Sequence, residues 1–273
     1  MKVIIVGGVA GGASCAARLR RLDEKAEIVM VERGPYVSYA NCGLPYHVSG
    51  VIPKESSLLV ANEKLFREQF RMDVRTNCEA IAISPQKKTV DLKNVETGAV
   101  TTESYDKLVL SPGAASVRPP LPGIDLPGIF QVRTVPDART IREWIEKGTT
   151  FLAGMYNYSG IQMVKPVRHA VVIGGGFIGL EMAENLVHVD FEVTVIEMLD
   201  QVLAPLDPEH ARCFLRAHHR KSRPKVRPRR EQTRHHSPIC HGAQRGGRHY
   251  HCDHLRDLRG VVAVTEFEPR RDS

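Results

Sequence analysis

The sequence has 273 residues but contains no run of about eighteen apolar residues, so it offers no candidate membrane-spanning helix. The first residues, "MKVIIVGG", pass directly into a strand-like apolar run. They contain no long h-region and no small-residue cleavage site, and we therefore predict no secretory signal. Six cysteines are scattered along the chain and do not form the framework of a disulfide-stapled domain. Together these absences favour a protein of the reducing cytoplasm.

Charge is divided unevenly along the chain. The net charge of +7 combines residues 1–211, where 25 acidic residues exceed 22 basic ones, with residues 212–273, where 16 basic residues face only 6 acidic ones. The second segment also holds 8 of the 12 histidines. Such an abrupt change predicts a boundary near Arg212, and the two parts are interpreted separately.

The N-terminal segment has the pattern of a dinucleotide-binding strand–turn–helix–strand motif. A β-branched run from Val3 to Val6 enters a glycine-rich turn and is followed by a helical apolar pattern. Gly7 allows the tight turn, and Gly12 lets the helix pack on the strand with its N–H groups facing a pyrophosphate. The next strand ends at Glu32, twenty residues after Gly12, where a carboxylate accepts from ribose hydroxyls. Val9 stands where G-x-G-x-x-G has its middle glycine.

A second motif of the same kind begins near residue 170. Gly174, Gly176 and Gly179 fit G-x-G-x-x-G in full, between a strand and a helix. The strand that follows ends at Glu197, eighteen residues after Gly179. An acidic residue there accepts from a free 2′-hydroxyl and repels a 2′-phosphate, which favours NADH and leaves NADPH open, since a neighbouring arginine can reverse the preference. Two dinucleotide sites in one chain indicate electron transfer between two cofactors.

These patterns predict an α/β protein with two nested, three-layer Rossmann-like units. Between the motifs, we expect Leu108 to Leu110 to form a buried strand that ends in the turn Ser111-Pro112-Gly113. The expected divisions are an FAD-binding domain in residues 1–147, a connecting surface insertion in 148–169, an incomplete NAD(P)H-binding domain in 170–211, and a disordered Arg/His-rich tail in 212–273.

A single cysteine stands out in "VSYANCGLPYHVSG". The residue five after Cys42 is His47, so the dithiol pattern Cys-x4-Cys is absent. A lone thiol can still cycle through a mixed disulfide with a small thiol, or through a sulfenic acid. The alternative is a buried structural cysteine, because free cysteine is among the most buried residue types. The polar neighbours Ser38 and Asn41 and the glycine-proline turn favour a reactive thiol.

Residues 1–211 resemble the single-cysteine branch of the flavin-dependent pyridine nucleotide–disulfide oxidoreductases, most closely the coenzyme A-disulfide reductases. The segments that match are "GGVAGGASCAARLRRLD", "SYANCGLPY", "SYDKLVLSPGA" and "GGGFIGLEMAENL". In that family the first loop is Gly-x-Val-Ala-Gly-Gly, so Val9 is a specific match. The resemblance implies FAD at the first site and NAD(P)H at the second. It also implies that Cys42 is the redox-active nucleophile that holds a coenzyme A mixed disulfide, which reduced FAD then cleaves.

The resemblance also assigns further residues, and it implies no metal. For FAD they are Gly7, Gly8, Val9, Ala10, Gly11, Gly12, Glu32, Arg33, Asn41, Ser111, Pro112 and Gly113. For the pyridine nucleotide they are Gly174, Gly176, Phe177, Ile178, Gly179 and Glu197. For coenzyme A they are Ser14, Arg18, Arg21, Ser38 and Asn41. Arg18 and Arg21 lie three residues apart, about one helical turn, so both can reach one anionic ligand.

Other functions remain open within the same family. The NADH oxidases and peroxidases resemble this chain, but they carry a histidine where Ala10 stands, which argues against peroxide as the main substrate. Persulfide or polysulfide reduction remains possible, because the same thiol and coenzyme A pocket would serve it. Family members continue with a Gly-Asp segment that closes over FAD and a C-terminal domain that forms a homodimer. We find neither here, so an inactive FAD-binding remnant is a further alternative.

The tail after "VLAPLDPEHAR" departs from the family pattern and has three interpretations. Its density of Arg and Lys would suit binding to a polyanion such as nucleic acid. We consider this interpretation of the tail the least favoured of the three. A metal site would use cysteines and histidines whose spacing matches no zinc pattern: Cys240, His241, His249, His251, Cys252 and His254. We favour an out-of-frame translation of a GC-rich gene, because pattern, acidity and apolar content are lost together near Arg212. The nucleotide sequence tests this, since a family-like continuation must then appear in another frame.

Overall fold

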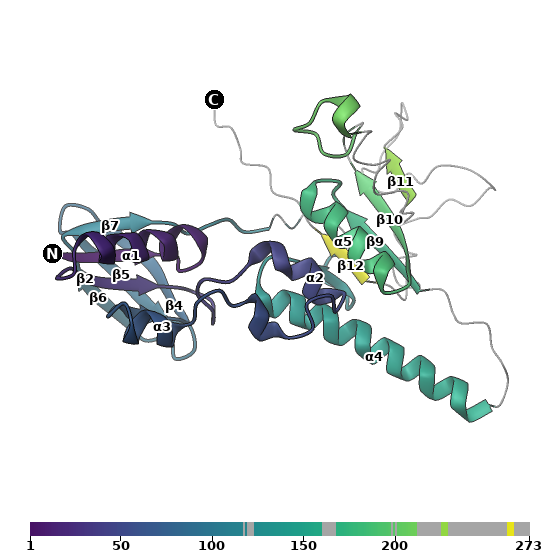
Figure 1. The fold of residues 1–273 in the computed structure, drawn as a ribbon, viewed down its shortest axis with the longest axis horizontal. Helices are drawn as coiled ribbons and strands as arrows, with labels where there is room; N and C mark the ends of the chain where they lie inside the picture. Colours follow the sequence, from purple (N-terminus) through teal and green to yellow (C-terminus); the bar gives the residue numbers. More distant parts are fainter. Residues whose placement is uncertain are drawn as a thin grey trace. The chain divides into compact units, whose positions relative to one another are not determined.

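The structure is a computed structural model that describes residues 1–116, 118, 123–159, 168–197, 199, 201–211, 225–228 and 261–264, with side chains through residue 211 except in 148–159. The chain divides into two compact units (Figure 1). The first unit comprises Met1–Asn41 and Lys54–Ala114, and the second comprises Cys42–Pro53 and Ala115–Ser273. The Cys42 segment is therefore grouped with the second unit.

A four-stranded parallel sheet forms the centre of the first unit. Its order is β3 (Asp73–Arg75), β2 (Glu27–Val31), β1 (Lys2–Val6) and β7 (Lys107–Leu110). Helix α1 (Ala10–Leu22) connects β1 to β2, so the N-terminal motif forms the expected strand–helix–strand unit. Helix α3 (Glu63–Glu68) precedes β3, and its N-cap Asn62 accepts from the backbone N–H of Leu65.

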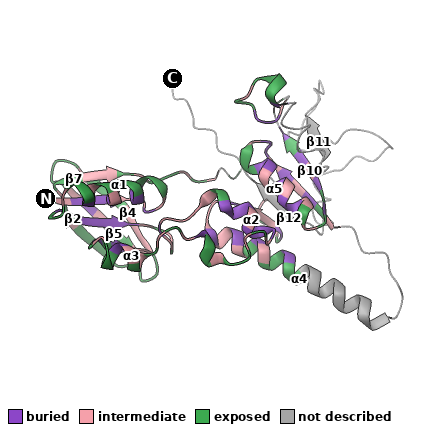
Figure 2. Ribbon diagram, in the orientation of Figure 1, coloured by how far each residue is buried: buried purple, intermediate pink, exposed green. Residues whose placement is uncertain are grey.

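The side chains of β1 and β2 alternate between two cores, as the period of two in a strand requires. Ile5 and Met30 pack with Phe66 and residues of α1 on the helical side. Ile4 and Val29 pack on the opposite face, against an antiparallel sheet of β4 (Cys78–Ser84), β5 (Thr89–Asn94) and β6 (Val100–Ser104). The first unit therefore has three layers, as predicted, and its central strands are buried on both faces (Figure 2).

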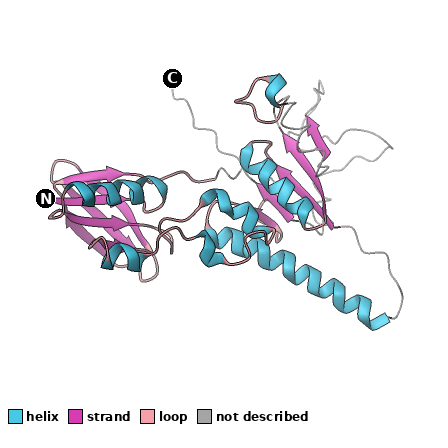
Figure 3. Cartoon of the chain, in the orientation of Figure 1, coloured by secondary structure: helices cyan, strands magenta, loops and turns pink. Residues whose placement is uncertain are grey.

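The second unit contains a five-stranded parallel sheet. Figure 3 draws strands of this sheet as magenta arrows next to a cyan helix. Its order is β11 (Lys225–Pro228), β10 (Phe191–Glu197), β9 (Arg168–Ile173), β12 (Val261–Val264) and β8 (Ile129–Gln131). Helix α5 (Phe177–His188) connects β9 to β10. Its buried residues Met182 and Leu186 belong to the apolar interior of this unit, as do Val193 and Val195 of β10. The second glycine motif thus also lies between a strand and a helix, as predicted.

Two strands of this sheet come from the segment expected to be a disordered tail. Strand β11 pairs with β10, and β12 lies between β9 and β8. Both strands are only four residues long, and the composition of the surrounding segment hid them. Apart from these two strands, residues 212–273 lie outside the described part of the chain. The cysteines and histidines considered for a metal site lie there too.

The segment that contains Cys42 packs against two helices of the second unit. A 3-10 turn, η1 (Asn41–Gly43), leads into α2 (Leu44–Val48), which contacts α4 (Val135–Ser159) and α5. Helix α4 continues through residue 159, so the segment expected as a surface insertion begins as helix. Residues 160–167 lie outside the described part. Over the described residues, no helix is both long and apolar enough to cross a membrane.

Candidate functional site

The first glycine loop is packed so tightly that only glycine fits at two of its positions. Gly7 has a φ of +92°, and a Cβ there would lie 1.9 Å from the carbonyl oxygen of Ser111. A Cβ on Gly12 would lie 1.7 Å from the carbonyl oxygen of Gly7. The N–H of Ser111 donates to the carbonyl of Val6 at 2.8 Å. The fold therefore brings the turn at Ser111, predicted to contact FAD, against the glycine loop.

Glu32 closes this loop with its carboxylate. Its Oε2 accepts from the backbone N–H of Gly8 and its Oε1 from that of Gly34, both at 2.8 Å. A carboxylate has about four lone-pair sites, so capacity remains for ribose hydroxyls. Arg33 points elsewhere: its side chain is 70% exposed and lies 3.6 Å from Glu79.

The second glycine loop is closed in the same way. Gly174 has a φ of +107°, and Glu197, which is 5% exposed, accepts through Oε2 from the N–H of Gly175 at 2.6 Å. Its Oε1 accepts from the N–H of Leu199 at 2.9 Å. A Cβ on Gly175 would lie 2.7 Å from Cγ1 of Val202. Gly175 was not among the predicted residues, because the fingerprint leaves that position free. Its equivalence to Gly8 was the available signal.

The correspondence between the two loops extends beyond the glutamates. The N–H of Ser38 donates to the carbonyl of Gly8, and that of Leu203 donates to the carbonyl of Gly175, each at 2.9 Å. Both donors have left-handed backbones, with φ of 46° and 52°. The chain thus builds one local structure twice, a glycine loop clamped by a glutamate. We call each copy a glycine–glutamate cradle.

Each cradle opens onto a helix start that has unoccupied N–H groups. Neither α1 nor α5 has a side-chain N-cap hydrogen bond or an acidic residue in its first turn. An anion such as a pyrophosphate is stabilised at such a position by the N–H groups and the helix dipole. Phe177 and Ile178, at the start of α5, are 53% and 42% exposed, which leaves them accessible to a ligand.

Cys42 is an exposed free thiol in the η1 turn. The other free cysteines of the described residues, Cys15 and Cys78, are partly buried, and burial raises the pKa of the Cys78 thiol. His47, at the position where a dithiol site has its second cysteine, is 4% exposed, and its Nδ1 lies 2.8 Å from the carbonyl oxygen of Ile52. The exposure of Cys42 argues against its alternative interpretation as a buried structural cysteine.

The face of α2 toward α5 carries polar groups. Burial, followed by the nearby carboxylates of Glu181 and Glu184, raises the pKa of the Tyr46 hydroxyl above its ordinary value. Burial also raises the pKa of Glu181. One turn on, the Ser49 hydroxyl donates to Oδ1 of Asn185 at 2.6 Å.

The predicted coenzyme A residues of α1 lie on one exposed face. Ser14, Arg18 and Arg21 are all exposed. Arg20, by contrast, is 8% exposed and donates to backbone carbonyls, among them that of Phe70 at 2.7 Å. The helix therefore separates one structural arginine from two that can meet a ligand.

Asn41 was predicted to contact both FAD and coenzyme A, and Ser38 to contact coenzyme A. Both residues are partly buried. Oδ1 of Asn41 is buried and has no hydrogen-bond partner among the described residues. A buried acceptor without a donor is rare in folded proteins, so this atom suits a ligand that donates to it.

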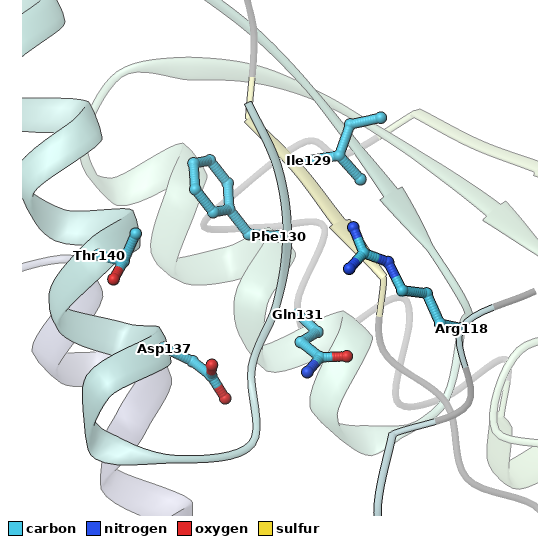
Figure 4. A pocket seen from close by; sticks show the side chains of 6 residues that line it. All are labelled: Arg118, Ile129, Phe130, Gln131, Asp137 and Thr140. Atoms are coloured by element: carbon cyan, nitrogen blue, oxygen red, sulfur yellow. The ribbon is translucent and has the colours of Figure 1, made fainter. Parts of the chain in front are cut away.

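A pocket lies elsewhere in the second unit. Its volume is about 190 Å³, and Figure 4 shows the lining residues Arg118, Ile129, Phe130, Gln131, Asp137 and Thr140. None of the predicted cofactor or substrate residues lines it. Asp137 is occupied as a helix cap, since its Oδ2 accepts from the N–H groups of Arg133 and Thr134. Within the described ranges, no group of three metal-binding side chains occurs.

Known proteins are similar to this chain in sequence and in fold. A coenzyme A disulfide reductase of Staphylococcus haemolyticus is 35% identical over 208 residues, which are 76% of this chain and 43% of the relative. The structure of reduced Bacillus anthracis CoADR-RHD is 43% identical, with a TM-score of 0.73 over 83% of this chain and 38% of that one. A NAD-dependent persulfide reductase from A. fulgidus is 36% identical, with a TM-score of 0.72 over 84% of this chain and 40% of that one. The chain therefore spans less than half the length of these relatives.

The model of the pyridine nucleotide-disulphide oxidoreductase family matches residues 1–267. The match continues past Arg212, where we expected the family pattern to end. The out-of-frame origin of the tail stays a prediction. With both cradles and the thiol segment inside the matched range, the chain belongs to the pyridine nucleotide-disulphide oxidoreductase family.

Proposed function

We propose that this chain is an FAD-dependent oxidoreductase that takes electrons from NADH and delivers them to a disulfide at Cys42. The observation that carries the proposal is an exposed free thiol in a chain that builds two glycine–glutamate cradles. Two cradles suit two dinucleotides, and a single accessible thiol suits a two-electron step on sulfur. The substrate class is coenzyme A disulfide or a related persulfide.

The first cradle fits FAD. Its loop from Gly7 to Gly12 would hold the pyrophosphate, Glu32 would accept from the ribose, and the turn at Ser111 would border the cofactor. The unpartnered Oδ1 of Asn41 offers a further acceptor. Bound FAD would supply the two-electron transfer between a nicotinamide and a disulfide.

The second cradle favours NADH. Glu197 is buried, and backbone N–H groups fix both of its oxygens, so the carboxylate cannot turn away from a ribose bound at the loop. A 2′-phosphate would meet that negative charge, whereas a free 2′-hydroxyl would donate to it.

Cys42 would act by thiol–disulfide exchange. Its thiolate attacks one sulfur of coenzyme A disulfide, the S–S bond breaks, and one coenzyme A leaves as a thiolate while the other stays bound as a mixed disulfide. Arg18 and Arg21 offer guanidinium groups for the phosphates of coenzyme A. Similarity to both a coenzyme A disulfide reductase and a persulfide reductase supports these two sulfur substrates.

The setting of the protein follows from the same chemistry. A free exposed thiol suits a reducing cytoplasm. The family resemblance implies assembly as a homodimer. We propose this assembly only for a protein that contains the family's C-terminal dimerisation domain.

The visible spectrum of the purified chain, recorded before and after anaerobic NADH, tests the proposal. A flavin spectrum that bleaches, followed by coenzyme A disulfide turnover, is the expected result. Cys42→Ser is the matched control, because it should still bind and bleach flavin but fail to turn over the disulfide. A chain that takes up no flavin even from added FAD would overturn the proposal and leave the inactive remnant.

A further inference from the structure

Helix α2, which follows the redox cysteine, is attached to α5 by a buried hydrogen bond. The Ser49 hydroxyl donates to Oδ1 of Asn185 at 2.6 Å, and the two residues are 8% and 4% exposed. Both residues belong to the second unit. A buried polar pair is costly unless its partners are satisfied, so it constrains where the two helices meet.

The amide of Asn185 has only one orientation that satisfies its surroundings. Its Nδ2 donates to the carbonyl oxygen of Glu181 at 2.8 Å, one turn earlier in α5. That contact needs a donor, so the amide must present its oxygen to α2. Ser49, which has one hydroxyl proton, is the matching donor. Asn is also a poor helix former at an interior position, where an apolar residue would pack as well.

This hydrogen bond joins two functional elements of the second unit. Helix α5 begins at Phe177, directly after the second glycine loop, and α2 follows the turn that holds Cys42. A second contact fixes the other end of the segment, because Arg142 of α4 donates through Nη1 to the carbonyl oxygens of Pro53 at 2.8 Å and His47 at 3.4 Å. The cysteine segment is therefore anchored on two helices.

We propose that Asn185 is a positioning residue, which through Ser49 holds α2 in the place where the Cys42 thiol meets its disulfide in a productive orientation. The inference rests on the proposed function. Asn185 does not touch the reacting sulfur. Its effect falls on reactions that demand an oriented thiol, and a small alkylating reagent does not demand one.

The experiment compares two reactions of Cys42 in the full chain. One is exchange with coenzyme A disulfide, and the other is alkylation by iodoacetamide, both followed by mass spectrometry of the Cys42 peptide. Ser49→Ala removes the donor and leaves Oδ1 of Asn185 buried without a partner. Asn185→Leu keeps a similar shape and leaves no orphan, since the Ser49 hydroxyl retains the carbonyl oxygen of Tyr46 at 3.1 Å.

Both variants are expected to lower the exchange rate about tenfold, the rate equivalent of one lost buried hydrogen bond, and to leave alkylation within about twofold. Ser49→Thr, which keeps the hydroxyl, should exchange with coenzyme A disulfide at close to the wild-type rate. Val193→Ala controls for general destabilisation, because it removes buried methyl groups from β10 without touching this hydrogen bond.

Exchange rates of Ser49→Ala and Asn185→Leu that stay within about twofold of wild type overturn the inference, as does an equal loss in Val193→Ala. A failure of the proposed substrate looks different, since wild-type Cys42 would then exchange with coenzyme A disulfide no faster than with cystine. In that case the ratio of cystine exchange to alkylation in the same variants still decides whether Asn185 positions the thiol.

Discussion

The carboxylate of Glu32 accepts the backbone N–H of Gly8 at 2.8 Å. This contact gives the acid a structural task besides the ribose binding proposed for it, because it holds the loop that would surround the pyrophosphate. Glu197 and Gly175 repeat the relationship at 2.6 Å in the second unit. A substitution of either glutamate therefore changes both the charge seen by the nucleotide and the shape of its loop.

We expect Glu197→Gln to shift nucleotide preference toward NADPH. Removing the negative charge removes the repulsion of a 2′-phosphate, so the ratio of the NADPH to NADH dissociation constants should fall about tenfold, or about 1.4 kcal/mol. Titrations of nicotinamide fluorescence measure both constants. Glu192→Gln is the control, since Glu192 lies on the same strand but is exposed and pairs with His169 at 3.5 Å. An unchanged ratio in Glu197→Gln would show that this carboxylate does not read the ribose.

Gly12→Ala should abolish flavin binding. The added Cβ would lie 1.7 Å from the carbonyl oxygen of Gly7, which is backbone and cannot yield without opening the loop. A destabilisation of about 3 kcal/mol or more is expected from this overpacking, read as a lower Tm together with lost flavin content. Gly11→Ala is the matched control, because its nearest neighbour would be the Ser111 hydroxyl at 3.3 Å. Equal flavin content in the two variants would contradict the tight loop.

Arg20→Ala should lower the stability of the chain, whereas Arg21→Ala should lower its rate of exchange with coenzyme A disulfide. Arg20 is buried and donates to the carbonyls of Phe70 and Arg71, at 2.7 and 2.8 Å, so its loss should destabilise the chain by about 3 kcal/mol. Arg21 is exposed, and its loss should leave Tm within error but slow exchange between Cys42 and coenzyme A disulfide. Thermal unfolding and exchange rates separate the two. A large drop in Tm for Arg21→Ala would place that residue in the structure rather than the ligand site.

Acid should weaken the first unit through Glu103. Hydrogen bonds from Lys2 at 2.7 Å and Arg75 at 2.9 Å hold the pKa of Glu103 below its ordinary value of 4.5. Because the folded-state pKa is depressed, this stabilisation is complete above the unfolded-state pKa and is lost as the pH falls through the folded-state pKa.

Glu103→Gln should therefore lower stability by about 1 kcal/mol at pH 7, and the difference from wild type should shrink below a pH of about 4. Tm values of both proteins across that range provide the measurement. Asp91→Asn, in which Asp91 accepts from Thr102 at 2.7 Å on neighbouring strands, serves as a comparison. A gap between wild type and Glu103→Gln that widens in acid would reverse the assigned sign.

The local motifs could be predicted because their causes are local. Gly7 and Gly12 stand where a turn and a close helix contact exclude side chains, and Glu32 ends the strand that follows, so spacing alone located the first cradle. Gly175 was missed because the fingerprint leaves its position free, and the crowding that favours glycine there comes from Val202, far along the chain. Only the fold reveals that contact.

Longer-range features were not predictable for the same reason. Strands β11 and β12 are placed by their pairing with β10 and β9. Each has only four residues, too few for a strand pattern to be recognised in the sequence. The grouping of Cys42 with the second unit depends on contacts of α2 with α4 and α5. Linear boundaries drawn from composition cannot express a segment that leaves one unit and joins another.

The excursion of residues 42–53 has a consequence for how the chain is made. During synthesis the first unit has all of its residues once Ala114 has emerged, but the cysteine segment must wait for partners that begin at Ala115. Domains generally fold as units in the order of translation. The thiol therefore spends the interval on an unpartnered loop. The nascent Cys42 thiol is then open to premature reaction with small disulfides, and a proteolytic cut after Ala114 would separate the cysteine segment from the rest of the second unit.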